Sequence, residues 1–239
     1  MSLLHRQQGT SHFWVAEKYS TSFEPGWLDA SYWQQRDAIA GTAQGRGTTL
    51  FIAHTPALVL RRYQRGGLVA KLNRMHYLYN GLQRSRPFQE LSLLQTLQQK
   101  QLPAPAPVAA GLYRCGLYYT AAILTERIAE ATDLVSRLRQ QSLGTSDWIE
   151  TGRTIARFHQ AGIYHSDLNA NNIMLDAQHQ VWVIDFDKCE QRPTGSWTSN
   201  NLSRLHRSLV KEKGKYPELH WQESDWQSLL EGYSGATSA

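Results

Sequence analysis

Two short polar clusters, each next to a strand-like segment, constrain the fold of this 239-residue chain more than any other feature. The first is HSDLNANN, residues 165–172, and the second is DFDK, residues 185–188, which comes directly after the apolar run VWVI. Their aspartates, Asp167 and Asp185, are 18 residues apart, and the apolar segment IML lies between them. Because carboxylates on two adjacent loops can share a site, the sequence predicts one centre that contains both clusters.

The ligands that this centre offers are oxygen atoms. Carboxylates and side-chain amides dominate both clusters, and such oxygens suit a hard cation or a hydroxyl group. Asn172 adds a neutral oxygen ligand to the two carboxylates. Asn and Asp are also common in turns, but the order and spacing of the two clusters argue against turns alone.

Together the clusters resemble the catalytic loop and the metal-binding motif of the protein-kinase-like fold. The chain reads His165-x-Asp167-Leu-x-x-x-Asn172 and then Asp185-Phe, in the order that this fold uses. The resemblance implies that Asp167 accepts a hydrogen bond from the attacking hydroxyl. It also implies that Asn172 and Asp185 hold Mg²⁺ against the phosphates of ATP. We expect His165 to be structural, bonding backbone near the loop.

A glycine-rich stretch in the front part of the chain resembles a phosphate-covering loop. Residues 41–49 read GTAQGRGTT, and the backbone N–H groups of such a loop can approach phosphate closely. The candidate nucleotide contacts in it are Gly41, Gly45, Arg46 and Gly47. Because a glycine loop alone does not identify a kinase, the next strand and helix must supply its partners.

The next predicted strand, LVLRR, carries arginine where ordinary kinases carry lysine. Arg61 can grip phosphates with its forked guanidinium, although it is not a simple replacement for lysine. Arg62 is adjacent, and the alternation of side chains along a strand leads us to assign the role to Arg61. Glu90, on the helix predicted from about Pro87, is its expected ion-pair partner; the alternative is a solvated helix charge.

The segment TERI, residues 125–128, matches a kinase hinge by order and spacing. There the backbone groups of Glu126 and Ile128 would bond adenine. Before it, QLPAPAPVAAG reads as an extended connector. After it, residues 147–161 predict an amphipathic helix that ends at Gly162, and the chain from about Asn200 is mostly helical.

These elements predict an α+β chain with a two-lobed, protein-kinase-like fold. Residues 1–125 form a β-rich N-lobe, and residues 126–239 form the hinge and an α-rich C-lobe, with a nucleotide cleft between them. Together the lobes make one kinase-like domain.

The composition narrows the partners and the compartment. Lys and Arg outnumber Asp and Glu by 25 to 20, which fits an anionic partner. The two cysteines form no metal motif and suggest a reducing compartment. No signal peptide and no apolar run of spanning length are evident, so any membrane contact is expected to be peripheral. The tryptophans are scattered, which argues against a nucleic-acid partner.

Three departures separate this chain from protein Ser/Thr kinases. Asn169 stands where those enzymes carry a lysine two residues after the catalytic aspartate, and Asp187 replaces the glycine of Asp-Phe-Gly. The chain after Lys188 has no long activation segment ending in Ala-Pro-Glu. Small-molecule kinases and RIO-type atypical kinases tolerate these changes.

A more specific resemblance extends from about residue 40 to 215. The segments RRYQRGGLVAKLN, LTERI, HSDLNANNIMLD and IDFDKCE, with NLSRLHRSL after them, resemble the 3-deoxy-D-manno-octulosonic acid (Kdo) kinase family. The resemblance implies transfer from ATP to the 4-hydroxyl of Kdo on a lipid A precursor, Kdo-lipid IVA, in lipopolysaccharide core biosynthesis of some Gram-negative bacteria. It also implies a peripheral protein at the cytoplasmic face of the bacterial inner membrane.

An anionic acceptor of this kind needs basic and polar contacts. The candidate substrate-binding residues are Arg65, Lys71, Asn169 and Lys188. Lys188 can alternatively pair with Asp187.

A second basic feature lies in the last third of the chain. Arg204, Arg207 and Lys211 share one helical face, beside a face with Leu202, Leu205 and Leu209. This helix can lie on an anionic membrane surface or can be an ordinary core helix with a solvated basic side.

Two other functions stay open on the sequence. A RIO-like atypical protein kinase would phosphorylate a polypeptide. A pseudokinase would bind nucleotide and serve as a scaffold; the irregular Arg61 favours it, whereas the presence of Asp167, Asn172 and Asp185 argues against it.

Overall fold

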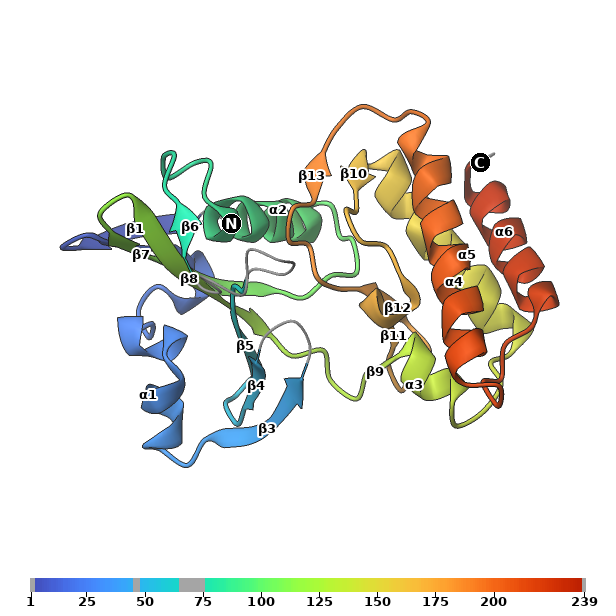
Figure 1. Ribbon diagram of the computed structural model, residues 1–239, viewed down its shortest axis with the longest axis horizontal. Helices are drawn as coiled ribbons and strands as arrows, with labels where there is room; N and C mark the ends of the chain where they lie inside the picture. The colour runs from blue at the N-terminus through green and yellow to red at the C-terminus, as the bar shows by residue number, and fades with distance from the viewer. Residues whose placement is uncertain (1–2, 45–47, 65–75, 238–239) are drawn as a thin grey trace. The chain divides into compact units, whose positions relative to one another are not determined.

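The computed structural model describes residues 3–44, 48–64 and 76–237 (Figure 1). The chain divides into two compact units. The N-lobe contains Met1–Gln99 and Pro105–Arg127, and the C-lobe contains Lys100–Ala104 and Ile128–Ala239. The fold is the α+β, two-lobed, kinase-like one that the sequence predicts. The chain passes from the N-lobe to the C-lobe after Arg127, two residues beyond the predicted boundary.

One antiparallel sheet forms the frame of the N-lobe. Its strands lie in the order β1-β2-β7-β8-β5-β4-β3, and the short β6 pairs with β8. The strands are β1 (Leu3–Gln8), β2 (Ser11–Ala16), β3 (Ile39–Gln44), β4 (Thr48–Ile52), β5 (Leu58–Arg62), β6 (Tyr77–Leu78), β7 (Pro107–Cys115) and β8 (Tyr118–Glu126). The sheet therefore reaches residue 126, at the end of the predicted β-rich N-lobe.

The strand that carries the two arginines and the strand that leads into the predicted hinge are neighbours in this sheet. Strand β5, which contains LVLRR, pairs with β8 so that Arg61 lies opposite Ile123 and Leu58 lies opposite Glu126. The prediction of a connector over QLPAPAPVAAG was wrong for its second half, because residues 107–111 are buried in β7 between β2 and β8. Apolar alanine and valine side chains suit that central position.

Helical elements cover the N-lobe sheet. The helix predicted from about Pro87 is α2 (Arg86–Gln99), and its leucines Leu91, Leu94 and Leu97 are buried. The short helices η1 (Glu17–Tyr19), η2 (Pro25–Leu28) and α1 (Ala30–Gln34) bring aromatic side chains into a core with the strands. Burial of large aromatic surface stabilises this small lobe.

The C-lobe is mainly helical, as predicted. Its helices are α3 (Leu134–Leu138), α4 (Thr145–Gln160), α5 (Trp197–Lys215) and α6 (Glu223–Thr237). Two small sheets accompany them, made of β9 (Thr132–Asp133), β10 (Ile163–Tyr164), β11 (Ile173–Leu175), β12 (Val181–Val183) and β13 (Glu190–Gln191). The segment Lys100–Ala104 belongs to this lobe because Pro103 accepts a hydrogen bond from the Val183 N–H (3.0 Å).

Helices α4 and α6 pack backbone to backbone in the C-lobe (Figure 1). A Cβ on Gly152 would lie 1.9 Å from the carbonyl oxygen of Leu229, and one on Gly232 would lie 2.0 Å from that of Ile149. Only glycine permits so close an approach. Helix α4 ends as predicted, with Gly162 in the left-handed region (φ 73°) just beyond it.

No helix in the described parts of the chain combines the length and the apolar character that crossing a bilayer requires.

Candidate active site

The β11–β12 hairpin brings the ends of the two polar clusters together. Ile173 lies opposite Val183 in this antiparallel pair, and the Ile184 N–H donates to the Asn172 carbonyl (2.9 Å). Asn172 and Asp185 are therefore neighbours at the same end of the hairpin. The catalytic loop enters this end through the short helix η4 (Ala170–Asn172).

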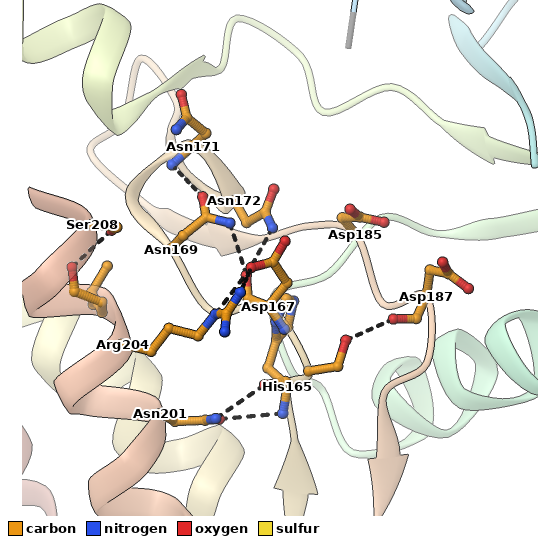
Figure 2. A network of polar contacts seen from close by, with 12 residues as sticks. His165, Asp167, Asn169, Asn171, Asn172, Asp185, Asp187, Asn201, Arg204 and Ser208 are labelled. Atoms are coloured by element: carbon orange, nitrogen blue, oxygen red, sulfur yellow. Dashed lines mark hydrogen bonds and ion pairs between the residues drawn. The ribbon is translucent and has the colours of Figure 1, made fainter. Parts of the chain in front are cut away.

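Side-chain amides hold the backbone of Asp167 (Figure 2). The Nδ2 atoms of Asn169 and Asn172 donate to its carbonyl oxygen at 3.0 and 2.9 Å. The Oδ1 of Asn169 accepts the Asn171 N–H, so both ends of that amide are engaged within the loop. The donation by Asn172 fixes its amide and leaves its Oδ1 as an acceptor that a cation can use.

Asn172 and Asp185 form a donor set that fits Mg²⁺. In the described residues no group of three or more His, Cys, Asp or Glu forms a complete metal site. Mg²⁺ in a phosphoryl-transfer site takes one or two protein ligands together with phosphate oxygens and water. Asp185 has a left-handed backbone (φ 64°), an uncommon conformation that is often found at functional positions.

His165 is a structural residue, as the sequence predicts. It is buried, its Nε2 lies 3.0 Å from the Ile184 carbonyl, and its Nδ1 accepts the Asp167 N–H (3.2 Å). Burial lowers the pKa of the imidazole, which keeps it neutral. Its ring meets that of Phe186 edge to face, with centroids 5.1 Å apart. His165 thus joins the catalytic loop to the Asp-Phe motif.

Helix α5 contacts the catalytic loop with residues that sequence reasoning did not assign to the site (Figure 2). Asn201 donates to the His165 carbonyl (3.0 Å) and accepts its N–H (3.3 Å). The Oγ of Ser208 accepts the Ala170 N–H (2.9 Å). Asn201 and Ser208 are seven residues apart and so share a helical face, which is the only signal that the sequence carries for them.

Arg204 lies between these two residues and forms an ion pair with Asp167. Its Nε donates to Asp167 Oδ1 (3.0 Å), and its Nη2 donates to the same oxygen. On the apolar side of α5, Leu205 and Leu209 are fully buried in the C-lobe. This burial supports the alternative that the sequence left open, a core helix with a solvated basic side.

In the N-lobe, Arg61 and Arg62 have different partners. Arg61 pairs with Glu90, whose side chain is only 4% exposed, and the Tyr63 hydroxyl donates to the second oxygen of that carboxylate (2.6 Å). Arg62 instead lies 3.5 Å from Asp29. The expected pair of Arg61 with Glu90 is thus present, and Glu90 is not a solvated charge.

The predicted hinge residue Glu126 is held by the N-terminal segment. Its carboxylate accepts from Lys18 Nζ (2.6 Å) and from the Tyr19 hydroxyl (2.7 Å). Burial and this hydrogen bond raise the pKa of Tyr19. The Glu126 N–H donates to the Ala106 carbonyl (2.9 Å), so a purine that contacts the backbone of Glu126 must use its carbonyl oxygen. Ile128 begins the C-lobe part of the chain.

Gly41 and Lys188 are the remaining candidate residues that the structure describes. Gly41 lies within β3, beside a bulge, and not in a turn. Lys188 is exposed with a left-handed backbone (φ 60°). Five predicted contacts lie outside the described residues: Gly45, Arg46, Gly47, Arg65 and Lys71.

Comparison with known proteins shows the family to which the chain belongs. The family model described as "Lipopolysaccharide kinase (Kdo/WaaP) family" matches residues 30–233. A 3-deoxy-D-manno-octulosonic acid kinase of Photobacterium profundum is 46% identical over 86% of this chain and 87% of its own length. Those of Vibrio vulnificus and Haemophilus influenzae are 41% and 37% identical, over 97% and 96% of this chain and 98% and 99% of their own lengths. The chain is therefore a member of the lipopolysaccharide kinase (Kdo/WaaP) family, whose chemistry is phosphoryl transfer.

Proposed function

We propose that this protein transfers the γ-phosphoryl group of ATP to the 4-hydroxyl of Kdo on a lipid A precursor, Kdo-lipid IVA. The observation that carries the proposal is the pairing of a catalytic loop, centred on Asp167, with relatives named 3-deoxy-D-manno-octulosonic acid kinase over nearly the whole chain. The polar clusters support phosphoryl transfer as the reaction, and the names of the relatives support Kdo as the acceptor.

Asp167 acts on the acceptor hydroxyl. Its carboxylate accepts the hydrogen bond of that hydroxyl and orients the oxygen toward the γ-phosphorus. A bond forms between the two as the bond from that phosphorus to the bridging oxygen of ADP breaks, and the hydroxyl proton passes to Asp167. The amides of Asn169 and Asn172 on its carbonyl keep the carboxylate in place during this exchange.

The nucleotide enters as its Mg²⁺ complex. The Asn172 amide oxygen and the Asp185 carboxylate would hold the cation, which neutralises phosphate charge when bound. In the N-lobe, the Glu90 carboxylate fixes Arg61, and the forked guanidinium binds phosphate oxygens. Glu126 and Ile128 would contact adenine through their backbone groups.

The lipid nature of this acceptor implies that the protein works at a membrane surface. The proposal places it peripherally at the cytoplasmic face of the bacterial inner membrane. The excess of Lys and Arg over Asp and Glu, 25 to 20, supports an anionic surface as partner.

A direct transfer assay tests the proposal. The purified protein is mixed with Mg·ATP and either Kdo-lipid IVA or a generic protein acceptor, and the products are analysed by mass spectrometry. We expect one phosphate on the lipid, located at the 4-hydroxyl by NMR, and its loss with Asp167→Ala. Phosphate on the protein acceptor would indicate a RIO-like kinase. ATP binding without transfer to either acceptor would indicate a pseudokinase.

A further inference from the structure

Helix α5 makes two kinds of contact with the catalytic loop. Asn201 and Ser208 bind backbone groups, of His165 and Ala170, and so fix the path of the loop. Arg204, on the same face, binds the side chain of Asp167 instead. Because this carboxylate is the one that carries the chemistry, the third contact bears on the reaction and not only on the path of the loop.

The geometry of the pair suits orientation of the carboxylate (Figure 2). Both guanidinium donors, Nε and Nη2, converge on Oδ1 of Asp167. Two donors on one oxygen restrict the rotation of the carboxylate about its Cβ–Cγ bond. A guanidinium is always charged and holds such a planar arrangement better than an ammonium does.

The catalytic loop itself supplies no cation at the expected place. Asn169 occupies the position at which protein kinases carry lysine, and its uncharged amide is engaged with Asp167 and Asn171. We infer that Arg204 is a positioning residue for the phosphoryl transfer. From α5 it supplies the positive charge that protein kinases place two residues after the catalytic aspartate, and it orients the Asp167 carboxylate for the acceptor hydroxyl.

Exposure indicates that stability is a small part of this contact. The side chains of Arg204 and Asp167 are 46% and 28% exposed. Ion pairs in contact with water usually contribute only about 0–1 kcal/mol to stability. Removal of the guanidinium should therefore leave a folded protein, in which a change in turnover can be measured.

The test compares Arg204→Gln and Arg204→Lys with Arg207→Gln, which removes an exposed arginine from the same helix. For each protein kcat, the KM values for Mg·ATP and acceptor, and Tm are measured. We expect Arg204→Gln to lower kcat roughly 100-fold, because small misplacements of a reacting group have effects of that size. The KM for Mg·ATP should stay within about threefold, and Tm within about 3 °C.

The lysine variant separates positioning from structure. It keeps the charge and loses the fork, so we expect it to recover part of the lost kcat, while Arg207→Gln behaves as the wild type. Retention of kcat within about threefold in Arg204→Gln would overturn the inference. So would a fall in kcat accompanied by an equal loss of folded protein, since that pattern belongs to a structural residue.

The inference rests on the proposed phosphoryl transfer but not on Kdo as acceptor. The same variants are therefore also compared in Mg²⁺-dependent hydrolysis of ATP, where water replaces the acceptor. If the wild type hydrolyses ATP without phosphorylating Kdo-lipid IVA, the proposed acceptor is wrong. Loss of hydrolysis in Arg204→Gln would then still support the role of Arg204, and unchanged hydrolysis would refute it.

Discussion

Arg61 on β5 and Glu90 on α2 form an ion pair inside the N-lobe, and the carboxylate of Glu90 is almost completely buried. The neighbouring Arg62 takes a different partner, Asp29. Two adjacent arginines thus differ in surroundings because successive side chains point to opposite faces of a strand. This difference provides a matched pair of variants.

Arg61→Met should raise the dissociation constant of Mg·ATP by roughly 10- to 100-fold, the usual range for loss of a charge-assisted contact. Arg62→Met should change it less than about twofold. Isothermal titration calorimetry measures both, and Tm is recorded beside it, because loss of Arg61 leaves the Glu90 carboxylate buried. Equal affinities in the two variants would contradict the assignment of Arg61 to phosphate binding.

Asp185→Asn should weaken the binding of Mg·ATP and leave the binding of metal-free ATP almost unchanged. The amide removes one negative ligand from the cation but keeps the size of the side chain. Titrations with and without EDTA measure the two affinities. If the substitution weakens both to the same degree, Asp185 acts on the nucleotide or on the fold and not on the cation.

Acid should destabilise the C-lobe. Burial lowers the pKa of His159 from 6.5 to about 4, and it lowers the pKa of His165 as well. The unfolded chain therefore binds protons first, so the free energy of unfolding is highest above pH 6.5 and falls as the pH decreases to about 4. A difference of about 2.5 pKa units at His159 corresponds to about 3 kcal/mol.

The change His159→Gln tests this pH dependence. Its amide can still bond to the Tyr233 hydroxyl, which lies 2.9 Å from His159 Nδ1. Chemical denaturation at several pH values should show a shallower decline between pH 6.5 and 4 than in the wild type. A decline of unchanged slope would show that His159 does not titrate as expected.

Gly152→Ala should destabilise the protein by about 1–3 kcal/mol or more, because the new methyl group cannot fit against the Leu229 carbonyl without separating α4 from α6. Gly235→Ala is the matched control: it lies on α6 with open space around it, and alanine there should be neutral or stabilise by up to about 1 kcal/mol. Thermal unfolding measures both, and similar Tm values would contradict the close helix contact.

The parts of the site that the sequence predicts are local. Asn172 and Asp185 lie on the two sides of one hairpin, so their spacing along the chain already brings them together. Arg61 is predicted from the alternation of one strand. Arg204 lies on a helix, 37 residues after Asp167. The sequence does not distinguish an arginine that binds the catalytic loop from one that contacts only solvent. Its partner is set by tertiary packing, which periodicity alone does not report.

For the fold, too, the elements with clear local signals are predicted and those without them are missed. The start of α2 is predicted from apolar spacing to within one residue, and α4, with its glycine stop, is predicted within two residues of its observed bounds. The buried strand over residues 107–111 was missed because prolines before it suggested a connector, and its small apolar residues lack the alternation of a half-buried strand.

The contacts of Lys18 and Tyr19 with Glu126 join positions 108 and 107 residues apart. The family model begins at residue 30, after both of these side chains. A version of the protein trimmed to the matched region would keep every motif of the kinase and would lose the two groups that hold the carboxylate at the end of β8. The segment before the matched region therefore fixes a side chain at the end of β8, more than 100 residues further along the chain.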